Sequence, residues 1–264
     1  MIELVALAQD VGAVAKSTVP SAGFWERLVT PLGGFVAILA VSLIVHAVLR
    51  RRVWWNGVFL VIGILALNWL LLVSGKMIQL EWTALSWNWP GKILATLMTA
   101  MIIWRTPVDP ARDLGLTLEQ TPGSTGPVAI EFALYCALVW GIEFWLNGAA
   151  GLVVPSGETL AFQAVMPSLE EELLFRGLAL FVLARAFASP LPSGVWFGPA
   201  AIALSLAFGL NHAVSYSGGW HFNGMAFALT GLFGLTATWM RLKSGSLLFP
   251  FLLHSASNLG LSFL

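Results

Sequence analysis

Long apolar runs recur along this 264-residue chain, and they constrain its fold more than any other feature. A helix that crosses a bilayer needs about 20 mostly apolar residues. The candidate spans are Leu32–Leu49, Trp54–Val73, Trp87–Trp104, Val128–Leu146, Leu160–Ala188, Val195–Val214, Phe222–Met240 and Leu247–Leu264. We therefore predict an all-α, polytopic transmembrane helical bundle of about eight helices. The protein should be an integral, multi-pass membrane protein, located in the cell membrane if the source is a prokaryote.

The composition supports this class and excludes others. Only 10% of the residues are charged, whereas soluble domains carry about 25%. The formal net charge is zero, so there is no electrostatic basis for nucleic-acid binding. A single cysteine, Cys136, excludes an intrachain disulfide. We expect the outer surface of the protein to contact the lipid bilayer.

Polar stretches divide the chain into three parts. Residues 1–30 contain Glu3 and Asp10 within their apolar stretch and lack a basic start, so they are predicted to be an extramembrane segment rather than a signal peptide. Residues 31–127 hold the first three spans and end in a proline-containing polar stretch. Residues 128–264 form the remaining core. Lys92, near the start of the third span, is expected to snorkel to the headgroups.

Basic residues are unevenly distributed between alternate loops. The loops after the first, third, fifth and seventh spans carry Arg50, Arg51, Arg52, Arg105, Arg112, Arg185, Arg241 and Lys243. Cytoplasmic loops are enriched in Lys and Arg. The pattern predicts that these loops are cytoplasmic and that both termini lie on the other side.

Three acids and an arginine interrupt the fifth apolar run. They are Glu170, Glu171, Glu172 and Arg176. Charges inside a bilayer are costly and usually face a site or a partner. Successive helical residues are about 100° apart, so the three acids cannot share one role. Glu172 and Arg176 have the i, i+4 spacing of an ion pair, which leaves Glu171 free to face the bundle interior.

A structural explanation of the acids remains open. Pro167 is well placed just before a helix start, so we expect the functional helix to begin near Ser168. Ser168 and Glu171 then match the capping box, in which serine and glutamate satisfy the first free N–H groups. This alternative explains one or two acids but leaves Arg176 unexplained.

Polar residues on two later spans complete a candidate site. His212 lies in the sixth span, and His254 and Asn258 share one face of the eighth. Either histidine taken singly can be a hydrogen-bonded core residue. Together with Glu171, they are the groups needed for amide hydrolysis: a base for water and donors for an oxyanion. Two histidines and a glutamate can equally hold zinc with one open position.

These patterns together resemble the CPBP group of intramembrane proteases, which includes the type II CAAX prenyl endopeptidases. The group's motifs EExxxR, FxxxH and HxxxN/B appear in order over residues 128–264. They read Glu171-Glu172-Leu-Leu-Phe-Arg176, Phe208-Gly-Leu-Asn-His212 and His254-Ser-Ala-Ser-Asn258. The resemblance implies a catalytic core at residues 128–264.

The resemblance also implies roles for these residues. Glu171 and His212 would polarise water, His254 and Asn258 would hold the oxyanion, and Glu172 and Arg176 would fix the site's geometry. No cofactor is firmly implied, but a zinc ion, if bound, would be held by Glu171, His212 and His254. Glu170 lies outside the motif.

The expected substrate is a membrane-anchored or lipidated protein or peptide, either a prenylated CAAX-type protein or a sorting tail. Two other functions remain open from the sequence: a non-catalytic bacteriocin-immunity or scaffold protein, and a small proton-coupled transporter.

Overall fold

The computed structural model describes residues 24–82, 84–148, 151–187, 198–216 and 218–264. Apart from one short hairpin, the described elements are helices. They are α2 (Phe24–Val29), α3 (Leu32–Ala47), α4 (Trp55–Trp82), α5 (Trp89–Arg105), α6 (Pro110–Leu114), α7 (Thr125–Asn147), α8 (Gly157–Glu172), the π-helix η2 (Leu173–Ala179), α9 (Leu180–Ala186), α10 (Pro199–Ala213), α11 (Gly224–Ser244) and α12 (Leu248–Phe263). Of the expected extramembrane segment 1–30, residues 1–23 lie outside the described ranges.

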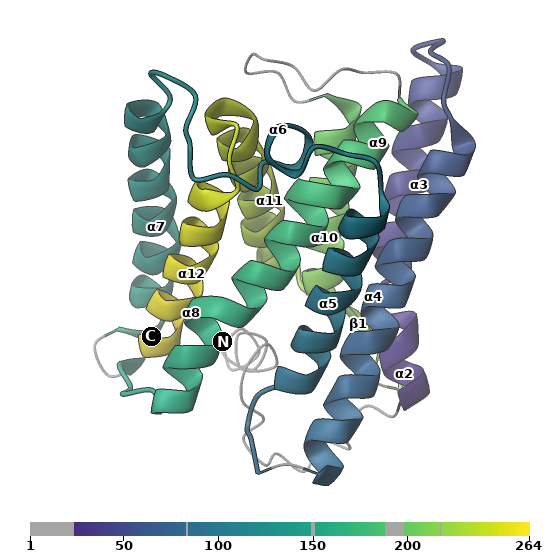
Figure 1. The fold of residues 1–264 in the computed structure, drawn as a ribbon. Helices are drawn as coiled ribbons and strands as arrows, with labels where there is room; N and C mark the ends of the chain where they lie inside the picture. Colours follow the sequence, from purple (N-terminus) through teal and green to yellow (C-terminus); the bar gives the residue numbers. More distant parts are fainter. Residues whose placement is uncertain (1–23, 83, 149–150, 188–197, 217) are drawn as a thin grey trace.

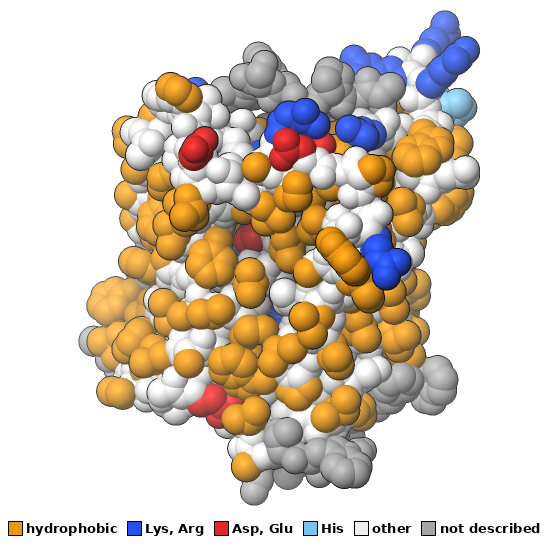
Figure 2. Space-filling model, in the orientation of Figure 1, with side chains coloured by type: hydrophobic (Ala, Val, Ile, Leu, Met, Phe, Trp, Pro, Cys, Tyr) orange, Lys and Arg blue, Asp and Glu red, His pale blue; other side chains and the backbone are white. Residues whose placement is uncertain are grey.

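Long helical rods run alternately up and down the molecule (Figure 1). The connection between α3 and α4, the short helix α6 and the end of α9 lie at the top of this view. Figure 2 shows hydrophobic side chains over the middle of this face and most of its Lys and Arg side chains near the top. The arginine-bearing connections thus share one end of the bundle, as the alternation of loops predicts.

Among the described residues, four stretches are long and apolar enough to cross a membrane: Arg27–Ala47, Trp55–Gln79, Thr125–Asn147 and Gly224–Ser244. The chain is therefore an all-α integral membrane protein, but the expected number of eight spans is not confirmed. Helices α5, α10 and α12 have only 17, 15 and 16 residues. The rod formed by α8, η2 and α9 carries the acid cluster, which lowers its hydropathy.

The predicted helix start near Ser168 is wrong. Helix α8 begins eleven residues earlier, at Gly157, and Pro167 lies inside it. Its N-cap is Ser156, whose hydroxyl accepts a hydrogen bond from the Thr159 backbone N–H at 3.1 Å. Ser168 and Glu171 therefore do not form a capping box.

Two serines make contacts beside Pro167, where α8 lacks one backbone donor. Proline removes one backbone hydrogen bond and crowds the carbonyl four residues earlier. Ser255 on α12 donates its hydroxyl to the Ala164 carbonyl at 2.7 Å and lies 3.0 Å from the Ser168 hydroxyl. The Ala164 carbonyl is the next one after that of Gln163, the carbonyl four residues before Pro167, so Ser255 ties α12 to α8 at the proline turn.

A short hairpin that the sequence did not indicate closes the lower end of α10. Strands β1 (Val214–Tyr216) and β2 (Trp220–Phe222) pair antiparallel, with Ser215 opposite His221. The hairpin begins at Val214, two positions after His212, so His212 lies in the last turn of α10. The hairpin therefore follows directly on the helix end that carries this candidate site residue.

Helices α4 and α5 cross closely at two glycines, and this contact offers a test of the packing. A Cβ at Gly75 would overlap the backbone of Gly91. We expect Gly75→Ala to lower the free energy of unfolding by about 1–3 kcal/mol, because backbone atoms cannot move aside cheaply. Thermal unfolding in detergent micelles measures the effect. Gly63→Ala, on the same helix with open space around it, is the control, and equal midpoints for both variants would contradict this crossing.

Candidate active site

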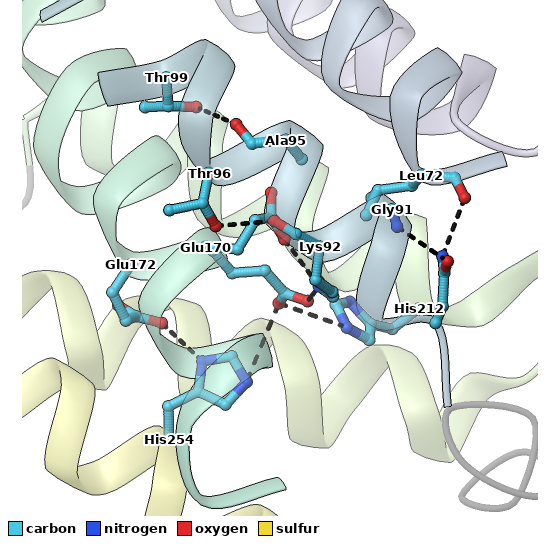
Figure 3. A network of polar contacts seen from close by, with 12 residues as sticks. Leu72, Gly91, Lys92, Ala95, Thr96, Thr99, Glu170, Glu172, His212 and His254 are labelled. Atoms are coloured by element: carbon cyan, nitrogen blue, oxygen red, sulfur yellow. Dashed lines mark hydrogen bonds and ion pairs between the residues drawn. The ribbon is translucent and has the colours of Figure 1, made fainter. Parts of the chain in front are cut away.

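Side chains from α8, α10 and α12 meet around the Glu171 carboxylate. Its Oε2 atom lies 3.9 Å from His212 Nε2 and 3.9 Å from His254 Nε2. Figure 3 shows Lys92, His212 and His254 approaching this region from different helices. The structure therefore brings together three of the residues that the motifs indicated.

The Glu171 Oε2 atom is buried and has no hydrogen-bond partner among the described residues. A buried oxygen without a partner is costly and calls for an explanation. Atoms that are 3.9 Å apart can share one water molecule at about 2.8 Å from each. The space facing Oε2 thus has the polar groups and the spacing that suit a single water.

The protons on both histidine rings follow from their neighbours. His212 Nδ1 lies 2.8 Å from the Phe208 carbonyl. A carbonyl only accepts, so Nδ1 carries the proton and donates it. His254 Nδ1 likewise lies 2.8 Å from Glu172 Oε1 and donates to that carboxylate. In each neutral ring, Nε2 is therefore left as an acceptor that faces Glu171.

A buried ion pair holds the second acid of the motif. Arg176 Nη1 donates to Glu172 Oε1 at 2.9 Å, and both side chains are only 2% exposed. The expected i, i+4 pair is thus present, although Arg176 lies within the π-helix η2. π-helical segments are frequent at functional sites. Because Glu172 also accepts from His254, this pair fixes the orientation of that imidazole.

Aromatic rings enclose the arginine. The Arg176 guanidinium lies 4.5 Å from the Phe208 ring centroid and 5.1 Å from that of Phe233. The Phe208 ring also packs against His212 at 4.4 Å, and Phe233 against His254 at 4.8 Å. These contacts give the phenylalanine of the FxxxH pattern a physical role: it covers the arginine and packs against the histidine one turn away.

Lys92 on α5 is a site residue that sequence reasoning missed. Its Nζ donates to Glu170 Oε2 and to Glu171 Oε1, each at 2.6 Å. The expectation that Lys92 snorkels to the headgroups is wrong, because its side chain is only 11% exposed and reaches inward. The signal available in the sequence was an ionisable residue within an apolar helix, which usually has a buried partner.

Asn258 follows His254 by one helical turn on α12. Its Nδ2 atom is buried and donates to no acceptor among the described residues. No contact in the described structure joins it to Glu171 or His212. An amide donor without an acceptor, one helical turn from His254, is the kind of group that can bind a developing negative charge.

The Glu171 carboxylate and the two histidines are spaced more widely than the ligands of a bound zinc ion. Tetrahedral ligands at about 2.0–2.1 Å from a zinc ion lie roughly 3.4 Å from one another, whereas both Nε2–Oε2 separations are 3.9 Å. The Lys92 ammonium also occupies the other oxygen of the same carboxylate. Within the described part of the chain, no group of three or more His, Cys, Asp or Glu residues is arranged to hold a metal ion.

Comparison with known proteins bears on the C-terminal half of the chain. A family model described as Rce1-like, type II CAAX prenyl endopeptidase, matches residues 152–260. The matched stretch contains all three motifs and confirms the resemblance drawn from them. It begins after α7 and leaves out Lys92. No curated protein and no solved structure gave a significant match.

Proposed function

We propose that this protein, whose residues 152–260 match the Rce1-like type II CAAX prenyl endopeptidases, is an intramembrane endopeptidase that cleaves a membrane-associated protein by direct attack of water. The observation that carries the proposal is the unpartnered Glu171 Oε2 atom, which two histidine Nε2 atoms face at equal distance. In this proposal all the long helical rods cross the bilayer, including the shorter ones that carry the site.

The site's groups suit general-base hydrolysis. A water between Glu171 and His212 would donate its protons to Glu171 Oε2 and His212 Nε2, which directs its free electron pair at the scissile carbonyl carbon. Glu171 takes a proton as the carbon–oxygen bond forms and later passes it to the leaving nitrogen. No metal takes part in this scheme.

The tetrahedral intermediate needs donors for its oxyanion. Asn258 Nδ2, buried without an acceptor, supplies one. His254 Nε2 supplies a second in a site that enters the reaction with one added solvent proton on this ring. Nδ1 stays bound to Glu172, and the ring keeps both protons throughout, so the proton on Glu171 still goes to the leaving nitrogen. No acyl-enzyme forms, because water itself is the nucleophile.

Loss of the Asn258 donor is expected to slow the chemical step. Asn258→Ala should lower kcat by about 10²- to 10³-fold and leave KM nearly unchanged, since the oxyanion exists only along the reaction path. Steady-state cleavage of a quenched peptide by protein in liposomes measures both constants. Ser262→Ala, one turn further along α12, is the control. If Asn258→Ala raises KM and leaves kcat unchanged, Asn258 binds the substrate instead.

The substrate class is tested by a panel of internally quenched peptides presented to the wild-type protein in liposomes. One peptide carries an S-farnesylated cysteine four residues from its C-terminus, a second is the same peptide without the farnesyl group, and a third has a transmembrane anchor and a polar tail. We expect cleavage only of lipid-anchored or membrane-anchored peptides, with mass spectrometry locating the cut. Proton-coupled uptake without cleavage of any peptide would refute the proposal and favour a transporter.

A further inference from the structure

We propose that Lys92 and Glu170 position the Glu171 carboxylate for catalysis, so that α5 contributes to the active site through a residue outside all three motifs. This inference rests on the proposed function. Lys92 acts here as a positioning residue, and Glu170 is the group that neutralises it.

The two oxygens of the Glu171 carboxylate have different neighbours. Lys92 Nζ binds Glu171 Oε1 at 2.6 Å, which leaves Oε2 toward His212 and His254. A carboxylate without this anchor can rotate about its terminal bond, because that torsion has a broad energy minimum. The ammonium therefore selects the orientation in which one oxygen faces the histidines.

The balance of charges gives a role to Glu170, the acid that lies outside the motifs. Glu170 is fully buried and binds Lys92 at 2.6 Å, while Glu172 binds Arg176 at 2.9 Å. Each accessory acid is thus offset by one base, and Glu171 carries the single surplus negative charge of the cluster. If Glu170 were absent, the ammonium would offset the charge of Glu171 alone and make it a weaker base.

The start of α5, which carries Lys92, is fastened to α8. Glu158, in the first turn of α8, accepts hydrogen bonds from the backbone N–H groups of Ser86 and Trp87 and from Trp89 Nε1 at 3.0–3.2 Å. The Trp87 ring stacks on Phe162 of α8 at 5.0 Å. The two helices are therefore held in register about one turn of α5 away from the ammonium.

Asn88 fastens the same end of α5 to α4. Its side-chain oxygen caps the helix by accepting from the Gly91 N–H at 3.1 Å, and its amide donates to the Leu72 carbonyl of α4 at 2.8 Å. Lys92 thus projects from a helix start fixed on two sides, which a positioning residue requires.

Three variants test the inference: Lys92→Met, Lys92→Arg and the double variant Lys92→Met with Glu170→Gln. We expect Lys92→Met to lower kcat by about 100-fold with little change in KM, as small displacements of a catalytic group do. Lys92→Arg keeps the charge and should retain activity within about tenfold of wild type. Lys243→Met, at the end of α11 and away from the site, is the matched control and should leave kcat unchanged.

The double variant separates positioning from structural support. Removing Glu170's charge together with Lys92 leaves no unpaired accessory charge, so the thermal midpoint should return toward the wild-type value. The kcat should stay low, because nothing then orients Glu171. Recovery of both the thermal midpoint and kcat in the double variant would overturn the inference, and so would wild-type kcat in Lys92→Met.

Glu171→Gln in the same assay distinguishes this failure from failure of the proposed function. An inactive Glu171→Gln beside a fully active Lys92→Met would remove only the role of Lys92. A fully active Glu171→Gln would remove the hydrolytic scheme itself.

Discussion

Glu171→Gln is expected to lower kcat by about 10³- to 10⁴-fold, the upper part of the range for loss of a general base. Glutamine has nearly the same shape as glutamate, and its amide oxygen can still accept a hydrogen bond from Lys92. It cannot take a proton from water, so the bond-forming step loses its base. Because the substrate still binds, KM should change little.

Cleavage of the quenched peptides by protein in liposomes measures this loss, with the thermal midpoint as a check on folding. Glu131→Gln provides the matched control: Glu131 also lies within a membrane helix, α7, where it accepts from the Thr236 hydroxyl at 3.3 Å. We expect its activity to stay within twofold of wild type. Retention of one tenth or more of the wild-type kcat in Glu171→Gln would contradict its role as the base.

Arg176→Met is expected to have the largest effect on stability, about 3–5 kcal/mol, since it leaves the buried Glu172 charge without its cation. The substitution also removes the Arg176 guanidinium that the Phe208 and Phe233 rings cover. Among the described residues, the hydrogen-bond partner of Glu172 that then remains is His254. Thermal unfolding in micelles and the yield of inserted protein both report the loss.

Arg185→Met is the control for this substitution, because Arg185 is an exposed arginine at the end of the same helical rod. The double variant Arg176→Met with Glu172→Gln should regain part of the lost stability, since no buried charge then lacks a partner. If Arg176→Met unfolds at the wild-type temperature, the buried pair does not stabilise the fold.

Much of the bundle was predictable because apolar runs and their flanking residues report helices directly. The expected first span, Leu32–Leu49, agrees closely with α3, and the expected fourth and eighth spans lie close to α7 and α12. The Glu172–Arg176 pair followed from i, i+4 spacing and the need of a buried arginine for a partner. The catalytic roles of the motif residues stay predictions.

What the sequence did not indicate depends on contacts between distant segments. Helix α8 runs through Pro167, and a serine 91 residues from Ala164 in the sequence donates to the Ala164 carbonyl beside that proline. Lys92 binds acids 78 and 79 residues away, and no local pattern links these positions. The π-helical segment η2 was likewise not predicted from the sequence.

The most direct test of the central claim is an experimental structure that resolves ordered water between α8, α10 and α12. We predict one water about 2.8 Å from both Glu171 Oε2 and His212 Nε2, with Glu171 Oε1 bound to Lys92. A metal ion at about 2.0–2.1 Å from Glu171, His212 and His254 would contradict the metal-free mechanism. A Glu171 carboxylate turned away from both histidines would contradict the hydrolytic site as a whole.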